Sequence, residues 1–326
     1  MKHIPFILFC CLCIALAGCA SAQPSSAPAA VEPTKAAAEP TKAVVEPAAE
    51  PTEVPPTDTP ALTALAPTET PVPAIPALPA EPQRIEFQTE DGVTLVGMYY
   101  PAAANPAPVV VLMHWAGGDK NDWVYVGMAA WLQNRGLEVP AAPGQMPFDT
   151  PYPFEPLPED SSFGVFLFDF RSYGESVISG EGDFSEMAAG WVLDAEAAYA
   201  TARTLEGADP EKVAGIGASI GADAVADGCG ELCAGALSLG PGNYLNVEYS
   251  ETVTALDDLG TPVWCVAAED DTPGLTTCNS AEGEHYYIQV YAEGGHAMTL
   301  FRESLNLDPL IEQVIVDFLG EAFGLE

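Results

Sequence analysis

Short apolar runs alternate with longer amphipathic stretches from residue 83 to the end of the chain. The apolar runs cover residues 109–113, 163–170, 213–218, 234–239, 263–268 and 285–291. Helix-like stretches cover residues 121–135, 186–205, 220–227 and 310–323. Runs that are apolar throughout are typical of strands that are buried on both faces. The pattern therefore predicts a mostly parallel sheet with helices on both faces.

Two further segments, residues 85–89 and 93–99, alternate apolar and polar positions on either side of Asp91 and Gly92. An Asp-Gly pair between alternating segments is typical of a tight hairpin turn. We therefore expect an antiparallel hairpin at one edge, which brings the sheet to about eight strands.

Residues 1–82 lack this pattern. Residues 1–19 combine a basic start, an apolar stretch and the sequence Leu16-Ala17-Gly18-Cys19, which resembles the lipobox of bacterial lipoproteins. We expect cleavage before Cys19 and lipid attachment to it, the alternative being an ordinary signal peptide. Residues 20–82 are rich in Pro, Ala, Thr and Glu, which predicts a disordered tether. The sequence thus predicts an exported protein, anchored to the outer face of a bacterial membrane, whose folded domain is residues 83–326.

The chain is strongly acidic, with 47 Asp and Glu residues against 10 Lys and Arg residues and a net charge of -37. Such a charge repels phosphate backbones and anionic lipid surfaces. It argues against nucleic acid as a partner and leaves the lipid as the one expected link to a membrane. The hydrophobic content of 48% is enough for a large core, and we expect a monomer.

Four of the eight cysteines lie in the predicted domain, at Cys229, Cys233, Cys265 and Cys278. An even number of cysteines in an exported domain predicts disulfides. Sequence proximity favours Cys229 with Cys233 and Cys265 with Cys278, although four cysteines allow three pairings. A metal site is less favoured, because Cys265 falls within an apolar run. We expect neither a metal ion nor a cofactor.

Residues 213–223 contain the strongest chemical signal. An apolar run leads into Gly217-Ala218-Ser219-Ile220-Gly221, and an Ala-rich helical stretch follows. Strand, sharp turn and helix with a serine at the tip form a nucleophile elbow, in which the glycines let strand and helix approach each other. The same residue types also occur as plain packing and capping residues at helix starts, so Ser219 needs partners elsewhere.

Polar or glycine-rich segments follow the other apolar runs, at the expected carboxyl edge of the sheet. They begin at His114, Arg171, Glu269 and Gly294. Of the four histidines, His3 lies in the signal, His285 opens a strand at the opposite edge, and His114 is better placed to shape a loop. His296, which follows two glycines at the end of the last apolar run, is the candidate base.

The order of serine, acid and histidine resembles that of the α/β-hydrolase fold family, and most of all its lidless dienelactone-hydrolase-like and carboxylesterase-like members. The resemblance covers residues 83–326. It implies Ser219 as the nucleophile, His296 as the base and Asp271 as the acid. The family places the acid three residues after the position held here by Ala268, and Asp270 is the alternative.

The resemblance also implies an oxyanion hole formed by the backbone N–H groups of Ile220 and Ala116. Trp115 replaces a usual glycine in that loop, so its N–H group is the alternative to that of Ala116. Ser172 replaces another usual glycine, in a segment from Asp169 to Ser176 that we expect to be structural.

An open and modest substrate pocket is expected, because residues 240–261, where many relatives carry a cap domain, have room for little more than one helix. Its candidate walls are Trp115, Tyr173, Trp191 and Tyr244, although such aromatic residues are as often plain packing. A proline-rich insert, residues 137–160, starts at the opposite end of the sheet. It is expected to wrap the surface unless it folds back over the domain.

These features together imply a serine hydrolase that cleaves small-molecule carboxylic esters through an acyl-enzyme. An exopeptidase or a thioesterase would use the same three residues with a different pocket. The non-enzymatic alternative is a surface-binding lipoprotein on an inactive hydrolase scaffold, and the intact serine, acid and histidine argue against it.

Overall fold

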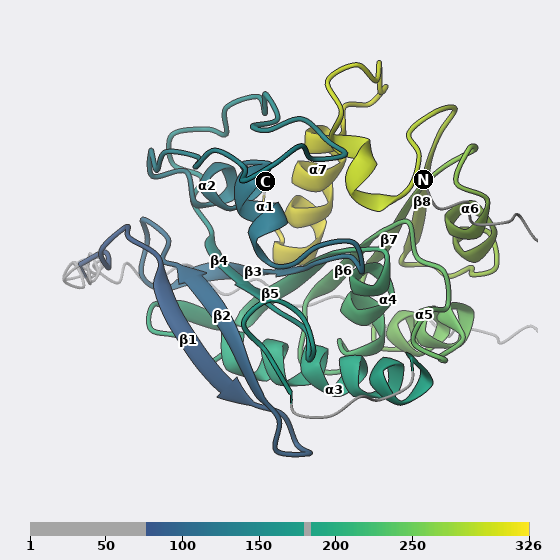
Figure 1. Ribbon diagram of the computed structural model, residues 1–326, viewed down its shortest axis with the longest axis horizontal. Helices are drawn as coiled ribbons and strands as arrows, with labels where there is room; N and C mark the ends of the chain where they lie inside the picture. The colour runs from purple at the N-terminus through teal and green to yellow at the C-terminus, as the bar shows by residue number, and fades with distance from the viewer. Residues whose placement is uncertain (1–75, 179–183, 326) are drawn as a thin grey trace, which may run out of the picture. The chain divides into compact units, whose positions relative to one another are not determined.

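A computed structural model describes residues 76–178 and 184–325, and these residues form a central sheet between two layers of helices (Figure 1). The expected signal with Cys19, and most of the expected tether, lie outside the described residues. Each helix in the described part of the chain is too short or too polar to span a lipid bilayer.

The sheet has eight strands in the order β1-β2-β4-β3-β5-β6-β7-β8. β1 (Gln83–Gln88) and β2 (Thr94–Tyr100) form the expected hairpin, and β2 also runs antiparallel to β4 (Gly164–Phe168). The other strands pair in parallel: β3 (Ala107–Met113), β5 (Ala208–Ala218), β6 (Gly235–Leu239), β7 (Val263–Ala268) and β8 (Tyr286–Tyr291). The prediction of a mostly parallel sheet with an antiparallel edge is confirmed.

Helices cover both faces of the sheet (Figure 1). One face carries α3 (Phe184–Ala202), α4 (Ile220–Asp227) and α5 (Tyr249–Asp258), and the other carries α1 (Asn121–Tyr125), α2 (Met128–Gln133) and α7 (Ile311–Phe323). Successive side chains of β3 alternate between the two layers: Val109 and Val111 join one core, and Val110 and Leu112 join the other. This strand is buried on both faces, which explains its uninterrupted apolar run.

Some helices differ from the prediction. Residues 121–135 form two short helices instead of one, because Gly127 between them has a φ of 95°, which a continuous right-handed helix cannot contain. α6 (Thr272–Cys278) and the short 3-10 helix η1 (Ala297–Phe301) were not predicted. Both are too short to give a recognisable apolar period in the sequence.

The packed domain begins earlier than residue 83. Arg135 Nη1 donates a hydrogen bond of 2.8 Å to the carbonyl oxygen of Leu78, and Gln133 Nε2 donates one of 2.7 Å to that of Ala80. The Leu78 side chain also lies against Gly207. The end of the expected tether is therefore part of the domain surface, which its proline-rich composition did not indicate.

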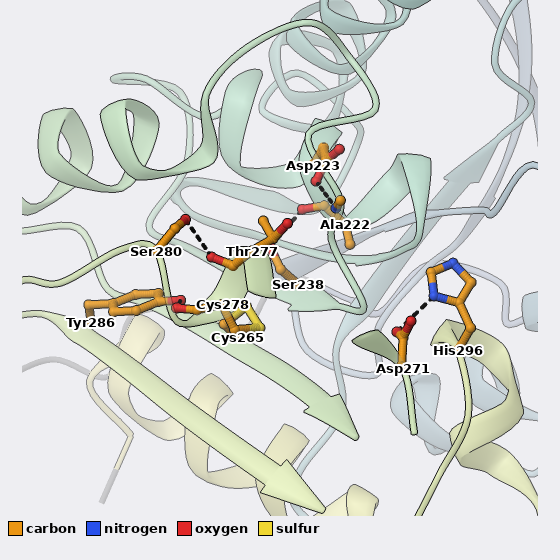
Figure 2. Close-up of a disulfide and its surroundings, with 11 residues drawn as sticks. Ala222, Asp223, Ser238, Cys265, Asp271, Thr277, Cys278, Ser280, Tyr286 and His296 are labelled. Atoms are coloured by element: carbon orange, nitrogen blue, oxygen red, sulfur yellow. Dashed lines mark hydrogen bonds and ion pairs between the residues drawn. A yellow bond between two sulfur atoms is a disulfide. The ribbon is translucent and has the colours of Figure 1, made fainter. Parts of the chain in front are cut away.

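Both expected disulfides are present, Cys229–Cys233 and Cys265–Cys278. The second joins β7 to the last residue of α6, so it closes the loop that carries Asp270 and Asp271. Figure 2 shows this disulfide near the pair formed by Asp271 and His296. Its two sulfur-bearing side chains are fully buried, so the bond is a structural link between strand and helix.

Removing either disulfide is expected to destabilise the domain without unfolding it. The loop-entropy relation gives about 3 kcal/mol for Cys265–Cys278, with a sequence separation of 13, and about 2 kcal/mol for Cys229–Cys233, with a separation of 4. Denaturant unfolding of the two double alanine variants measures the difference directly. This account would be contradicted if the variant without Cys229–Cys233 lost more stability than the variant without Cys265–Cys278.

Candidate active site

Ser219 occupies the turn between β5 and α4, where its backbone has a φ of 54° and a ψ of -115°. A positive φ is uncommon for a residue other than glycine, and such strain is concentrated at functional sites. A Cβ atom on Gly217 would overlap the carbonyl oxygen of Gly221, and a Cβ atom on Gly221 would overlap that of Met113. Both glycines are therefore required where strand and helix approach each other, as expected for a nucleophile elbow.

Ser219, His296 and Asp271 are joined by two hydrogen bonds. His296 Nε2 lies 2.8 Å from Ser219 Oγ, and His296 Nδ1 lies 2.8 Å from Asp271 Oδ2. Because an ionised carboxylate only accepts, Nδ1 carries the ring proton and the bare Nε2 accepts the hydroxyl proton of Ser219. The ends of β5, β7 and β8 thus bring together three residues that lie far apart in the sequence.

The Asp271 carboxylate lies in an enclosed place, with only 4% of its side chain exposed. A Cβ atom on Gly240 would lie 3.0 Å from Asp271 Oδ2, and one on Gly274 would overlap the same oxygen. The loop after β6 and the first turn of α6 therefore need glycine at these two positions. This close packing fixes the carboxylate against the imidazole of His296.

Asp270 has a different set of partners. Its Oδ1 accepts the backbone N–H groups of Gly294, at 3.1 Å, and Gly295, at 2.8 Å. These glycines immediately precede His296, so Asp270 holds the loop on which the histidine is carried. Of the two acids that the sequence left open, Asp271 is the one bonded to the His296 ring.

The loop after β3 passes close to the first turn of α4, where Gly221 lies against the carbonyl groups of Met113 and His114. The carbonyl oxygen of Trp115 accepts hydrogen bonds from His114 Nδ1, at 2.8 Å, and from the Gly118 N–H group, at 3.3 Å. In a trans peptide the N–H group of the following residue points in the direction opposite to the carbonyl group. The N–H group of Ala116 is therefore directed away from the His114 ring.

His114 shapes this loop, in agreement with the role expected from the sequence. It is fully buried, and its Nε2 accepts the backbone N–H group of Phe170 at 3.1 Å. Burial lowers the pKa of the ring, so the neutral form is retained. Only the neutral ring with its proton on Nδ1 can make both of its backbone bonds.

A buried ion pair, which the sequence analysis missed, fixes the same loop. Lys120 Nζ lies 2.6 Å from Asp169 Oδ2, and the Lys120 N–H group donates to Asp169 Oδ1 at 2.9 Å. The one signal of this ion pair in the sequence was a lysine after the glycine-rich loop, in a chain with few basic residues. Ser172, which replaces a usual glycine nearby, adopts a positive φ of 70°. Asp169 thus has structural contacts, as expected for the segment from Asp169 to Ser176.

The four candidate pocket residues have different surroundings. The prediction that Trp191 lines the pocket is wrong, because its ring is completely buried in the core beneath Tyr173. Trp115 turns back over its own loop, where its Nε1 donates to Asp122 Oδ2 at 2.7 Å. Tyr173 packs against His114, with ring centroids 4.9 Å apart. Tyr244 is the candidate that lies beside the His296 ring, with centroids 6.2 Å apart.

Asp223 was also missed, although it lies one helical turn after Ser219 in an otherwise Ala-rich segment. It is 1% exposed, and its carboxylate accepts the N–H groups of Gly242, at 2.9 Å, and Tyr244. Burial is the main cause that raises its pKa to about 7, against the lowering effect of these backbone donors. An acidic residue on the expected buried face of a helix was the available signal.

The free energy of unfolding is expected to fall between pH 6 and pH 8. Asp223 ionises near pH 4 in the unfolded chain and near pH 7 in the fold, so its stabilisation is complete at low pH and lost as the pH rises through 7. It alone should contribute about 1 kcal/mol to this fall. Denaturant unfolding at both pH values measures it, and Asp223→Asn should flatten the slope. An unchanged slope in that variant would disprove the assignment.

The insert of residues 137–160 does fold back along the domain. The Tyr152 N–H group donates to the carbonyl oxygen of Val126 at 2.9 Å. The Asp149 N–H group donates to the carbonyl oxygen of Phe301 at 3.1 Å. Phe301 is the last residue of η1, which starts directly after His296. The insert therefore supports the segment that carries the histidine.

Between β6 and β7, α5 is the one helix of the described chain, so this region holds no cap domain.

Among residues 76–178 and 184–325, no group of three or more His, Cys, Asp or Glu side chains is placed to hold a metal ion.

Comparison with known proteins gives distant relatives. No protein-family model matches the chain. The uncharacterized protein YfhR of Escherichia coli (strain K12) is 24% identical over 151 residues, which are 46% of this chain and 42% of that protein. The chain thus matches less than half of the length of this curated relative.

Three solved structures are similar at low identity. The 2,6-dihydroxy-pseudo-oxynicotine hydrolase has a TM-score of 0.51 and 15% identity, over 75% of this chain and 69% of that one. The α/β hydrolase GrgF from Penicillium sp. sh18 has a TM-score of 0.50 and 17% identity, over 75% and 99%. DcsB with its substrate analogue has a TM-score of 0.52 and 13% identity, over 75% and 100%. Together with the strand order and the elbow, these similarities show that the chain has the α/β-hydrolase fold.

Proposed function

We propose that the chain is a serine hydrolase that cleaves carboxylic esters, with Ser219 as the nucleophile, His296 as the base and Asp271 as the acid. The observation that carries the proposal is the pair of 2.8 Å hydrogen bonds that links these residues on a strained elbow. Strain at a positive φ persists only where the surrounding structure enforces it. An inactive scaffold would have no need for all three residues in this arrangement.

The proposed reaction has two steps. Ser219 Oγ attacks the ester carbonyl carbon while His296 Nε2 takes its proton, and the C–O bond to the alcohol breaks as His296 returns that proton to the leaving oxygen. Water then attacks the acyl-enzyme, His296 takes its proton, and Ser219 Oγ leaves and is protonated again. Asp271 holds the imidazole in the required tautomer and stabilises its cation.

Two backbone donors are proposed to stabilise the oxyanion. The N–H group of Ile220 has no partner within α4, because it belongs to the first residue of the helix. The N–H group of Ala116, which points away from the His114 ring, is proposed as the second donor, and that of Trp115 is the alternative. Losing one such donor typically costs about 10² to 10³ in rate.

The substrate is proposed to be a small neutral or cationic ester. The net charge of -37 repels esters that carry carboxylates or phosphates, and α5 leaves no cap over the site. The two disulfides support an oxidising location, and lipid attachment at Cys19 would place the domain, as a monomer, outside the cell.

A fluorophosphonate probe tests the proposal, because it phosphonylates an activated serine and releases fluoride. We expect labelling of the native protein at one site, which peptide mapping assigns to Ser219. Heat-denatured protein is the control, since labelling that survives denaturation would reflect plain chemical reactivity. A folded protein that neither reacts with the probe nor hydrolyses p-nitrophenyl acetate would refute the proposed function.

A further inference from the structure

Trp115 begins the turn that follows β3, and its side chain is held by a buried acid. The Trp115 carbonyl oxygen accepts the Gly118 N–H group at 3.3 Å, which closes a four-residue turn. The Trp115 indole Nε1 donates to Asp122 Oδ2 at 2.7 Å. A Cβ atom on Gly118 would overlap that carboxylate oxygen and would lie 2.8 Å from Nε1. The turn therefore closes directly over the bond between the indole and the carboxylate.

The peptide that carries the Ala116 N–H group depends on this bond for its position. Ala116 and Gly117 are both exposed, so neither holds the turn by burying a side chain. The Trp115 ring supplies the packing instead, because a Cβ atom on Gly117 would lie 3.1 Å from it. The Trp115 carbonyl oxygen is bonded within the loop and its indole is bonded to Asp122, so both the backbone and the side chain of this residue are fixed.

Asp122 is itself held firmly. It lies in the first turn of α1 with 6% of its surface exposed, and its N–H group donates to the carbonyl oxygen of Asp119 at 3.1 Å. Lys120, at the start of the same helix, bonds Asp169 through both its N–H group and its Nζ. Because Asp169 directly follows β4, the start of α1 is tied to the sheet. Asp122 passes this fixed position on to Trp115.

The Asp122 carboxyl group has an indole as its partner where a cation would be expected. In the described part of the chain, no salt bridge includes Asp122. Burial is the main cause that raises its pKa to about 6, the Trp115 bond lowers the pKa, and the charge of Asp119 raises it. An apolar side chain of similar volume would fill this place without the cost of burying a carboxyl group, so filling space does not account for the acid.

We propose that Asp122 is a positioning residue for the oxyanion hole, which acts through the Trp115 indole to hold the N–H group of Ala116 where the oxyanion forms. The inference rests on the proposed function. Displacing a group by about 1 Å can cost about 10² in rate, without removal of the group itself. Acylation and deacylation both form an oxyanion, so both steps should slow together when the donor is displaced.

The test is Trp115→Phe, which keeps an aromatic ring over the turn and removes the indole donor. The kcat for p-nitrophenyl acetate should fall about 10- to 100-fold. KM should stay within about twofold of native, because acylation and deacylation slow together. Trp131→Phe is the matched control, since its Nε1 donates to the carbonyl oxygen of Glu155 at the same distance of 2.7 Å, outside the site. That variant should keep the native kcat and KM.

Trifluoroacetone provides a readout that a loss of stability would not move. Ser219 Oγ adds to its carbonyl carbon, His296 takes the hydroxyl proton, and the carbonyl oxygen becomes an anion in the oxyanion hole. The affinity for such an analogue follows the stability of the transition state, so its inhibition constant should rise in Trp115→Phe by the factor by which kcat/KM falls. A merely structural bond would lower the free energy of unfolding and leave the inhibition constant unchanged.

Asp122→Leu and Asp122→Asn separate the hydrogen bond from the charge. Leucine has a similar volume and accepts no hydrogen bond, so Asp122→Leu should reproduce the losses of Trp115→Phe, and the double variant should lose no more than either alone. The amide oxygen of asparagine still accepts the indole proton, so Asp122→Asn should recover kcat to within about threefold of native. Trp115→Phe and Asp122→Asn decide the question even if Asp122→Leu does not fold.

Two results would overturn the inference. One is a folded Trp115→Phe whose kcat and inhibition constant stay within about twofold of native. The other is an Asp122→Asn variant that loses as much kcat as Trp115→Phe, which would show that the charge and not the hydrogen bond matters. Native protein that neither hydrolyses the ester nor reacts with the fluorophosphonate probe would instead refute the proposed function.

Discussion

Replacing Ser219 with alanine is expected to lower kcat for p-nitrophenyl acetate by about 10⁶, the loss typical for removal of a triad serine. The substitution removes the atom that forms the acyl-enzyme and leaves the oxyanion donors in place. Alanine accepts the positive φ at this position about as poorly as serine does, so the elbow should be retained. Steady-state hydrolysis and probe labelling measure the effect, and both should disappear together.

Ser280→Ala is the matched control for this prediction. Ser280 is exposed, and its hydroxyl bonds only the carbonyl oxygen of Thr277 among the described residues. It should keep native activity and labelling. If Ser219→Ala retained more than about 1% of kcat with an unchanged circular dichroism spectrum, another nucleophile would have to carry the reaction.

The elbow could be predicted because its physics is local. Gly217 and Gly221 are required by contacts within one strand-turn-helix unit, and the steric rule is visible in the sequence itself. The apolar runs predicted the parallel strands for the same reason, since burial on both faces leaves a continuous apolar signal. His296 was found by its place at the end of the last strand.

Contacts between distant segments could not be predicted in this way. Asp270 and Asp271 follow the same strand, and only the fold shows that one bonds the glycine loop and the other bonds the imidazole. Trp191 was assigned to the pocket because it is aromatic, but α3 turns it into the core. Asp223 and Lys120 acquire their roles from partners in other loops, which no local pattern encodes.

Replacing Asp271 with asparagine is expected to lower kcat by about 10⁴ and to leave the fold unchanged. Asparagine fits the enclosed place between Gly240 and Gly274, but its NH₂ group can donate to His296 Nδ1. The ring proton then resides on Nε2, which can no longer accept the proton of Ser219. Turnover of p-nitrophenyl acetate and the rate of probe labelling should both fall.

Asp270→Asn makes the same chemical change one residue away and is the matched control. Its Oδ1 can still accept the N–H groups of Gly294 and Gly295, so the loop before His296 should hold and kcat should fall by no more than about tenfold. The contrast between neighbouring positions separates the orientation of the imidazole from general loss of negative charge, because both variants lose one carboxylate. A larger loss in Asp270→Asn than in Asp271→Asn would show that the bond to Asp271 is not the one that orients His296 during turnover.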